Sequence, residues 1–485
     1  MSPNQIGFAL LILGLFLLIG KVIRVKVGWV QKLFLPSSII GGFLLLILGP
    51  QVLGQLVPGM SEGGVFTEEM LAVWRTLPGL LISVVFATMF LGQDLPSPKR
   101  AARLVGPQLS LGVALGSSQY VVGLLLAALV LVPVFSASPM TGALIEIGFE
   151  GGHGTAAGMR GVMEDLGFTE GADLAVGLAT VGIVGGIVIG IALINWGVRT
   201  GRTELLKDDV KASVDEQKGL FSKDEYYPAA TMTSRPASVE PLSLHMALVA
   251  VAILIGWAIL ESLRWIEAQT YSSVLLNDST PLEIFAYVPL FPLALIGGVI
   301  LQAIAAALKV DHLIDHQMML RIQGWALDFL IIAAIGTLSL MAIGANIWAF
   351  TLLAVAGVGV NVGLFLWLAP RIIGRYWFER GIGDFGQSMG VTATGLILMR
   401  ITDPDAESPA FEAFGYKQLI FEPFFGGGMI TALAVPIIFL TGIWPLFFAM
   451  LLIFAIAVGA GLIYYAPKAK AERAEAREGT SAVTT

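Results

Sequence analysis

Cysteine is absent from this 485-residue chain, and charged residues are scarce. Without cysteine the chain has no disulfides, no thiolate metal ligands and no thiol nucleophile. Charged residues make up 13% of the chain, hydrophobic residues make up 56%, and the mean hydropathy is +0.83. Soluble domains carry about 25% charged residues. The composition therefore predicts a membrane protein whose main surroundings are the lipid bilayer.

Two further function classes are excluded by what the sequence lacks. The formal net charge is -7 and basic residues form no stripe, so nucleic acid is not an expected partner. The sequence contains no Gly-x-x-x-x-Gly-Lys-Ser/Thr and no His-Glu-x-x-His, whereas the pattern Gly-x-Ser-x-Gly occurs at 59–63 and 386–390. The two missing motifs are those of P-loop ATPases and metalloproteases, and a Gly-x-Ser-x-Gly match alone does not indicate a serine hydrolase. We therefore do not expect an enzyme.

Long apolar stretches make up most of the chain. Crossing a hydrocarbon core of about 30 Å takes about 20 helical residues, and eleven stretches are candidates. They lie near residues 5–23, 33–53, 74–93, 104–134, 172–196, 244–264, 285–308, 322–343, 347–370, 417–440 and 444–465. The sequence predicts an all-α membrane protein with about eleven crossings.

The basic residues predict how these helices are oriented. Lys21, Arg24 and Lys26 follow the first stretch, whereas Glu68 and Glu69 precede the third. Because basic residues mark the cytoplasmic side, we expect the N-terminus outside and the C-terminus in the cytoplasm. We expect a multi-pass protein of a bacterial inner membrane.

Similar motifs recur in the two halves. Pro36-Ser-Ser-Ile-Ile-Gly-Gly42 and Pro292-Leu-Ala-Leu-Ile-Gly-Gly298 share their proline-to-glycine spacing. Five helices per half would give the halves opposite orientations, as in inverted-repeat transporters. The predicted parts are repeat one (1–196, with a hairpin at 140–168), a cytoplasmic linker (197–241), repeat two (242–442, with a hairpin at 383–402), an extra helix (443–466) and a polar tail (467–485).

Two glycine-rich segments are too short and too polar to cross a membrane. The first runs from Glu150 to Gly158 and the second from Asp384 to Gly395. Irregular backbone at membrane depth is tolerated where protein or water satisfies its amides and carbonyls, and the same groups can bind ions or substrate. The sequence predicts two re-entrant hairpins that meet at a central site.

At these segments the sequence resembles the sodium/glutamate symporter family. The resemblance rests on Gly151-Gly-His-Gly-Thr155, on Ala179-Thr-Val-Gly-Ile-Val-Gly-Gly186 and, more loosely, on the second hairpin. It implies a sodium-coupled carrier of anionic amino acids, with glutamate as the expected substrate. It further implies two inverted repeats, a homodimer, and an elevator mechanism in which a hairpin-bearing unit slides against a scaffold. The chain departs from the family at Glu150, where small hydroxyl residues are usual.

The candidate site residues come from both hairpins. For the substrate they are Gly152, His153, Gly154, Thr155, Gln387, Ser388, Thr392, Thr394 and Arg400. For sodium, the one expected ion, they are Glu150, Gly151, Thr155, Asp384, Ser388 and Thr392. His153 fits a substrate contact and a purely structural hydrogen bond equally well. We expect Arg160 to pair with a neighbouring carboxylate, and leave Arg400 open as a carboxylate clamp.

Two other functions fit the same pattern. A sodium-coupled carrier of citrate or another di- or tricarboxylate would share the inverted halves and glycine-rich hairpins. A passive channel would conduct without sodium and without accumulating its solute. The residues alone do not separate these functions from glutamate symport.

Overall fold

The structure is a computed structural model that describes residues 3–33, 35–57, 63–93, 98–206, 218–221, 226–274, 285–403 and 407–483. Within these ranges all regular secondary structure is helical. Ten helices there are long and apolar enough to cross a membrane. The prediction of an all-helical, multi-pass membrane protein is confirmed at this level.

The ten candidate spans coincide with ten of the predicted stretches. They are α1 (Pro3–Lys26), α3 with α4 (Ser37–Leu48, Leu53–Leu56), α5 (Glu68–Thr88), α6 with α7 (Pro98–Leu126, Val132–Phe135), α11 (Gly171–Arg199), α13 (Pro241–Val274), α14 (Leu290–Ala307), α15 (His316–Gly336), α17 with α18 (Ile347–Trp367, Ala369–Ile372) and α22 with α23 (Ile443–Ala460, Ala466–Val483). The helix predicted over 443–466 thus continues through most of the expected polar tail.

The remaining stretch, 417–440, does not form the single helix that we expected. The chain there forms α20 (Ala410–Phe421) and α21 (Met429–Thr441). At 1.5 Å per residue each helix is only about 20 Å long, too short to cross a bilayer alone. Pro423 follows α20, and Gly426 and Gly427 adopt φ values of +66° and +103°. Because the stretch 417–440 is largely apolar, its composition alone did not reveal this break.

The described chain divides into two compact units, which we treat separately. Unit 1 comprises Met1–Leu95, His153–Asp173 and Asp215–Met341, and unit 2 comprises Pro96–Gly152, Leu174–Val214 and Ala342–Thr485. Unit 1 contains α1, α3, α5, α13, α14 and α15. Each unit therefore draws helices from both sequence halves. The predicted repeat boundaries at 196 and 242 stay a prediction.

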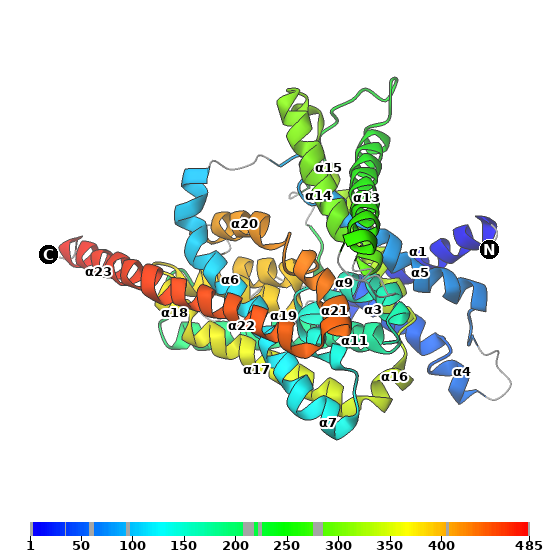
Figure 1. Cartoon of the computed structure of the whole chain (residues 1–485). Coiled ribbons are helices and arrows are strands. Elements are labelled where there is room, and N and C mark those ends of the chain that lie inside the picture. The colour runs from blue at the N-terminus through cyan, green and yellow to red at the C-terminus, as the bar shows by residue number, and fades with distance from the viewer. Residues whose placement is uncertain are drawn as a thin grey trace. The chain divides into compact units, whose positions relative to one another are not determined.

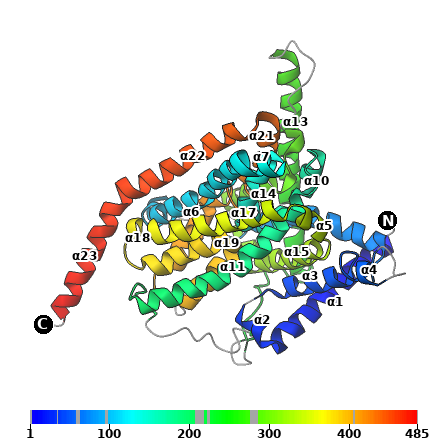
Figure 2. The same cartoon turned by 90° about the horizontal axis from the view of Figure 1, so that it is seen from below.

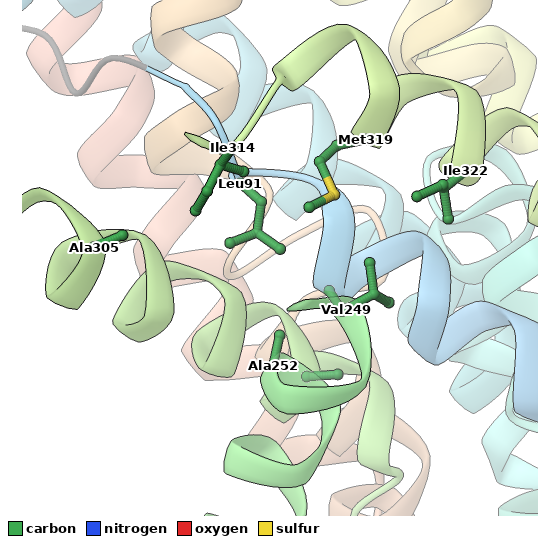
Figure 3. Packing of buried hydrophobic residues seen from close by; sticks show 9 residues of the cluster. Leu91, Val249, Ala252, Ala305, Ile314, Met319 and Ile322 are labelled. Carbon is green, nitrogen blue, oxygen red and sulfur yellow. The ribbon is translucent and has the colours of Figure 1, made fainter. Parts of the chain in front are cut away.

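The core of unit 1 is formed by small and branched apolar side chains. Helices α13, α14 and α15 lie beside one another (Figure 1). Val249 and Ala252 of α13 face Met319 and Ile322 of α15 in one buried cluster, to which Leu91 also belongs (Figure 3). Alanine at such positions brings the helix backbones close, which favours packing where lipid supplies no hydrophobic driving force.

Glycines allow α1 and α3 of unit 1 to touch backbone to backbone. A Cβ on Gly20 of α1 would lie 2.2 Å from the carbonyl oxygen of Ser37 in α3. A Cβ on Gly41 of α3 would lie 2.7 Å from the carbonyl oxygen of Phe16 in α1. Any larger residue at either position would push the two helices apart.

Helices α13 and α14 of the same unit make the equivalent contact. A Cβ on Gly256 of α13 would lie 2.5 Å from the carbonyl oxygen of Leu293 in α14. A Cβ on Gly297 of α14 would lie 2.0 Å from the carbonyl oxygen of Ala252 in α13. Within each helix of both pairs, the glycine lies four residues after the position that the partner glycine contacts.

In unit 2, α6 packs against α17, α20 and α22. Helix α22 continues through a π-helical turn, Gly461–Tyr465, into α23, which runs in a different direction (Figure 2). The predicted linker begins as the end of α11. Its described part reaches Glu379 of α19 (Trp377–Thr402), whose carboxylate accepts hydrogen bonds from the backbone amides of Glu204 and Leu205 at 2.6 and 3.1 Å. Linker residues 207–217 and 222–225 lie outside the described residues.

Candidate functional site

The second predicted hairpin is a helix that turns back on itself. Within α19, Gly390 (φ -154°, ψ 51°) and Val391 (φ 60°, ψ 172°) leave helical geometry. A Cβ on Gly383 would lie 2.2 Å from Sδ of Met399, sixteen positions later. In a continuous helix the two would be about 24 Å apart. The chain therefore reverses at Gly390, and this segment is not a straight spanning helix.

The first predicted hairpin is broken into short helices. They are α8 (Leu144–Phe149), α9 (Gly152–Gly158) and α10 (Arg160–Asp165), and none is long enough to cross a membrane. Gly152 begins α9 with a φ of +68°. Left-handed backbone of this kind favours glycine, and here it lets the chain bend between α8 and α9.

The tips of the two segments meet inside unit 2. The Ser388 hydroxyl donates a hydrogen bond of 2.6 Å to Oε1 of Glu150. A Cβ on Gly152 would lie 2.3 Å from Cγ1 of Val391, so glycine is required for this approach. The expectation that these two glycine-rich segments come together is confirmed for these residues.

The break in α19 frees a carbonyl group, which neighbouring helices bind. The carbonyl oxygen of Ser388 would accept from the Thr392 amide if the helix were regular. Instead it accepts from Gln119 Nε2 of α6 at 2.8 Å and from Asn361 Nδ2 of α17 at 2.9 Å. Amide side chains from two other helices thus hold the broken backbone in place.

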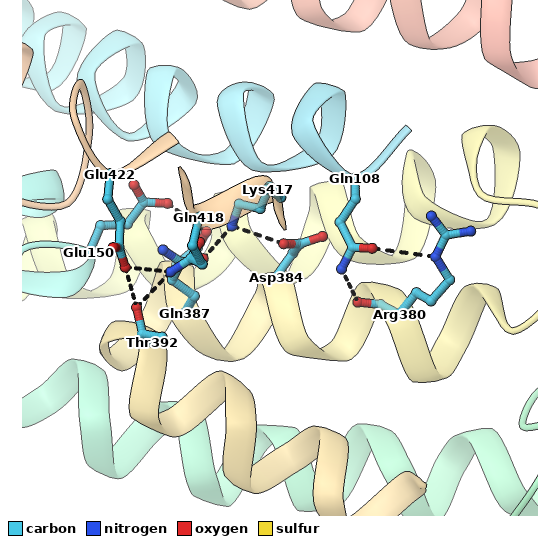
Figure 4. A network of polar contacts seen from close by, with 10 residues as sticks. Gln108, Glu150, Arg380, Asp384, Gln387, Thr392, Lys417, Gln418 and Glu422 are labelled. Atoms are coloured by element: carbon cyan, nitrogen blue, oxygen red, sulfur yellow. Dashed lines mark hydrogen bonds and ion pairs between the residues drawn. The ribbon is translucent and has the colours of Figure 1, made fainter. Parts of the chain in front are cut away.

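A fully buried ammonium lies next to this break. Lys417 of α20 is 1% exposed, and its Nζ lies 3.0 Å from Oδ1 of Asp384, which is 0% exposed (Figure 4). The same ammonium donates to Oε1 of Gln387. It also lies 5.0 and 4.4 Å from the ring centroids of Phe414 and Phe421. Removing either partner of such a buried pair leaves an uncompensated charge.

A second carboxylate, that of Glu422 directly after α20, binds the return arm of the hairpin. Oε1 of Glu422 accepts hydrogen bonds from Thr392 Oγ1 at 2.9 Å and from Gln418 Nε2 at 2.5 Å (Figure 4). Gln418 Nε2 also lies 2.7 Å from Thr392 Oγ1, so the three side chains form a closed triangle. Glu422 lies where α20 ends and the break begins.

Glu146 of α8 stabilises the break between α20 and α21. This carboxylate is 0% exposed and accepts hydrogen bonds from Tyr120 Oη at 2.5 Å, from the Gly426 amide at 2.8 Å and from Thr431 Oγ1 at 2.8 Å. Three donors satisfy an ionised carboxylate without a counter-charge. Glu146 therefore acts as a buried anchor between the first hairpin and the broken helix.

Two glycines of α6 leave room for the charged side chains. A Cβ on Gly112 would lie 2.8 Å from Cε of Lys417, and a Cβ on Gly116 would lie 2.8 Å from Oε2 of Glu150. The second oxygen of Glu150 has no hydrogen-bond partner among the described residues, although the residue is only 3% exposed. An acidic oxygen in this state can bind a cation.

The structure places five predicted site residues in three hydrogen-bonded groups of unit 2: Glu150 with Ser388, Asp384 and Gln387 with Lys417, and Thr392 with Glu422 and Gln418. Gly151 donates its amide to the Glu146 carbonyl at 3.0 Å, beside these groups. The Thr394 hydroxyl bonds to the Gly390 carbonyl at 2.5 Å, inside the hairpin.

Other predicted residues lie elsewhere. His153, Gly154 and Thr155 belong to unit 1, where all three are buried. The Thr155 hydroxyl has no hydrogen-bond partner among the described residues. Arg400 is exposed near the end of α19, outside these buried groups. Arg160 pairs with Asp173 at 2.8 Å, so its expected pairing with a nearby carboxylate is confirmed.

Sequence reasoning missed Lys417, Glu146 and Gln119. Lys417 is the only basic residue between Arg400 and Lys468. An ionisable residue in an apolar stretch is costly and usually functional, and this signal would have found Lys417. Glu146 and Gln119 had weaker signals, because single polar residues often only join helices.

Many apolar spans, broken segments that meet and buried charged groups beside them are typical of a membrane transporter. Over residues 5–401 the sequence matches the model of the sodium/glutamate symporter family. This match covers most of the chain, and the protein belongs to that family. Its general class is sodium-coupled glutamate transport, with sodium as the co-transported ion. No curated protein matches the chain closely.

Proposed function

We propose that the protein imports glutamate, or a closely similar anionic amino acid, by sodium symport. One observation carries this proposal: in a member of the family, the tips of two broken segments meet and bury acidic, hydroxyl and carbonyl oxygens together. Glu150 Oε1 and Ser388 Oγ are 2.6 Å apart at that point. Freed backbone groups and buried oxygens at such a junction are suited to a monovalent cation and an anionic substrate.

The hydroxyl and carboxylate oxygens of Glu150, Ser388 and Thr392 are the sodium ligands that we favour, with Gly151 and Thr155 as further candidates. The Glu150 and Thr155 side chains each keep a buried oxygen without a hydrogen-bond partner among the described residues. For the substrate we propose Gly152, Gln387 and Thr394 of unit 2, while His153, Gly154 and Thr155 of unit 1 stay a prediction from the sequence. Arg400 would contribute only from its exposed position.

We propose an elevator mechanism in which unit 2, which carries the buried network, is the moving unit. The matched glycine contacts in unit 1 support two repeats, because the α1–α3 and α13–α14 pairs use the same four-residue arrangement. A homodimer is part of the same proposal. In an elevator cycle the protein alternates between two states. A ligand shifts the balance between these states only by binding one of them more tightly than the other.

Charge sets a minimum for the coupling. Moving one net negative charge into a cell at about -100 mV costs about 2.3 kcal/mol. One sodium ion would only neutralise glutamate, so the membrane potential drives uptake only when two or more sodium ions accompany it. We therefore propose at least two sodium ions per substrate.

Uptake into proteoliposomes tests this function. Wild-type protein should accumulate labelled glutamate only with an inward sodium gradient, because the gradient is the energy source. We expect His153→Ala and Thr392→Ala to lower the initial rate by about tenfold or more, as loss of a single buried hydrogen bond costs about 1–3 kcal/mol. His312→Ala and Thr441→Ala, both at exposed positions, serve as controls. If both site variants show normal uptake, the hairpins do not form the transport site.

A carrier of citrate or another di- or tricarboxylate is the second candidate. Competition separates the two, because unlabelled citrate would then block uptake at lower concentrations than glutamate does. A channel would let glutamate equilibrate without sodium and without accumulation. The same assay, with sodium replaced by choline, therefore distinguishes all three functions.

The proposed orientation, with the N-terminus outside the bacterial inner membrane, has a direct test. The chain contains no cysteine, so single cysteines can be introduced and labelled in intact cells with a membrane-impermeant thiol reagent. Glu164→Cys should be labelled and Lys470→Cys should not. The reverse pattern would invert the topology.

A further inference from the structure

Lys417 lies in surroundings that would suit a free monovalent cation. Its Nζ contacts two oxygens of the second hairpin, Asp384 Oδ1 at 3.0 Å and Gln387 Oε1. Two aromatic rings, Phe414 and Phe421, face it at 5.0 and 4.4 Å. Oxygens together with the faces of aromatic rings stabilise a positive charge. A lysine side chain therefore supplies the charge that a sodium ion could supply at the same place.

Lys417 is the stronger of two cations that balance the charge of Asp384. The carboxylate is completely buried, its ion pair is with Lys417, and its Oδ2 has no hydrogen-bond partner among the described residues. Arg380, one turn earlier on α19, is the second positive charge that acts on Asp384, and its Nε donates to Gln108 Oε1 at 3.3 Å (Figure 4). A buried carboxylate without a nearby cation is strongly unfavourable.

We propose that Lys417 is a tethered cation that permanently fills a cation site formed by Asp384 and Gln387. Asp384 is then not a ligand of a transported sodium ion, although the sequence suggested that it was. The transported sodium ions bind at the hairpin tips, where Glu150, Ser388 and Thr392 lie. This inference rests on the proposed sodium symport. It specifies that Asp384 is the buried acid whose charge is already neutralised, by Lys417.

The ammonium differs from a sodium ion in one physical respect. It is covalently attached to α20, so it stays with the protein through every transport cycle and needs no gradient to bind. Removing it should open a vacant site that sodium can enter, because Asp384 and Gln387 would keep their oxygens in place. The protein would then bind one more sodium ion than the wild type binds.

Lys417→Gln tests this directly on the full-length purified protein. Thermal melting is followed while sodium replaces choline at constant ionic strength, with no substrate present. We expect Lys417→Gln to melt at least 5 °C below wild type in choline and to recover most of that loss in sodium. In proteoliposomes, one additional sodium ion should enter per substrate, measured from the reversal potential.

Two further variants separate charge from packing. Lys417→Arg keeps the cation and should titrate with sodium as the wild type does. The double variant Asp384→Asn with Lys417→Gln removes both charges, so it should melt near wild type in choline and gain no extra sodium dependence. A Lys417→Gln protein that can be purified only in sodium would also support the tethered cation.

Equal sodium titrations for wild type and Lys417→Gln would overturn the inference. So would a double variant as unstable as the single one, or one that does not fold, because the pair would then matter for packing alone. Each of these results is independent of whether the wild type shows sodium-driven glutamate uptake. A failure of this inference can thus be told apart from a failure of the proposed function.

Discussion

Single residues in unit 2 show how a charged network is accommodated inside an apolar protein. Three of the buried carboxylates are stabilised in different ways: Glu146 has three uncharged donors, Asp384 has an ammonium, and Glu150 has only one hydroxyl. Burying a charge without hydrogen bonds or a partner is costly. Glu150 is the least compensated of the three, which makes it the acid with the most to gain from a transported cation.

Gly116→Ala tests whether the position of Glu150 matters. The new Cβ would lie 2.8 Å from Glu150 Oε2 and 3.0 Å from a ring carbon of Phe425, so the carboxylate must move. Crowding of this kind costs about 1–3 kcal/mol. We expect the sodium concentration for half-maximal uptake to rise by about tenfold while the protein still folds.

The control for this change is Gly415→Ala on α20. A Cβ at Gly415 has no atom within 4 Å, and alanine favours a helix over glycine by about 1 kcal/mol. Sodium dependence should be unchanged and the melting temperature should rise slightly. If Gly116→Ala titrates like this control, the Glu150 carboxylate is not a sodium ligand.

At the scale of elements, the breaks in the helices create the site. Hairpin α19 reverses at Gly390 and Val391, and the chain bends again between α20 and α21. Each break frees backbone groups that side chains then bind, as Gln119 and Asn361 do for the Ser388 carbonyl. Val391 has a φ of 60°, which is unusual for a β-branched residue. Strain of this kind persists only where surrounding contacts hold it.

The contact between the hairpin tips predicts a double-mutant effect. Gly152→Ala would place a methyl group 2.3 Å from Cγ1 of Val391 and at a φ of +68°. We expect it to lower the free energy of unfolding by about 2–4 kcal/mol, from crowding and backbone strain together. Val391→Ala removes the Cγ1 atom, so the combined variant should recover about half of the loss in a thermal melt.

Additive effects of these two changes would show that the hairpin tips do not contact each other in the folded protein. Contacting residues give interaction energies of about 0.5–3 kcal/mol, whereas distant ones are additive. Val391→Ala alone provides the reference for the cycle.

At the scale of the whole molecule, the two compact units contain different kinds of interaction. Unit 1 is held by glycine and alanine contacts between helices, and unit 2 contains the charged network. In both helix pairs each glycine lies four residues after the position that the partner glycine contacts, so substitutions in either pair should have similar effects.

Gly41→Ala and Gly297→Ala test this equivalence. Their Cβ atoms would lie 2.7 and 2.0 Å from the carbonyl oxygens of Phe16 and Ala252, and backbone cannot move aside without separating the helices. We expect each to destabilise unit 1 by about 1–3 kcal/mol and to lower the melting temperature. Gly79→Ala and Gly324→Ala, where a Cβ meets nothing within 4 Å, should not. A marked effect in only one pair would argue against a structural repeat.

The sequence alone determined the class of protein and most of its helices. Lipid removes water from the backbone, so an apolar run of sufficient length becomes a helix with little dependence on its neighbours. Ten predicted stretches are therefore helices, and the glycine-rich segments are correctly excluded from spanning. The family also follows from local motifs, because a contiguous motif such as residues 151–155 can be recognised without knowing the tertiary structure.

Only the tertiary structure decided which polar residues share a site. Lys417 and Asp384 are 33 positions apart, and Glu150 and Ser388 are 238 apart, so no local pattern pairs them. The break at 422–428 likewise depends on long-range donors, since Glu146 binds the Gly426 amide across 280 positions. Charge compensation in a low-dielectric interior depends on distance in space, and that distance comes from packing.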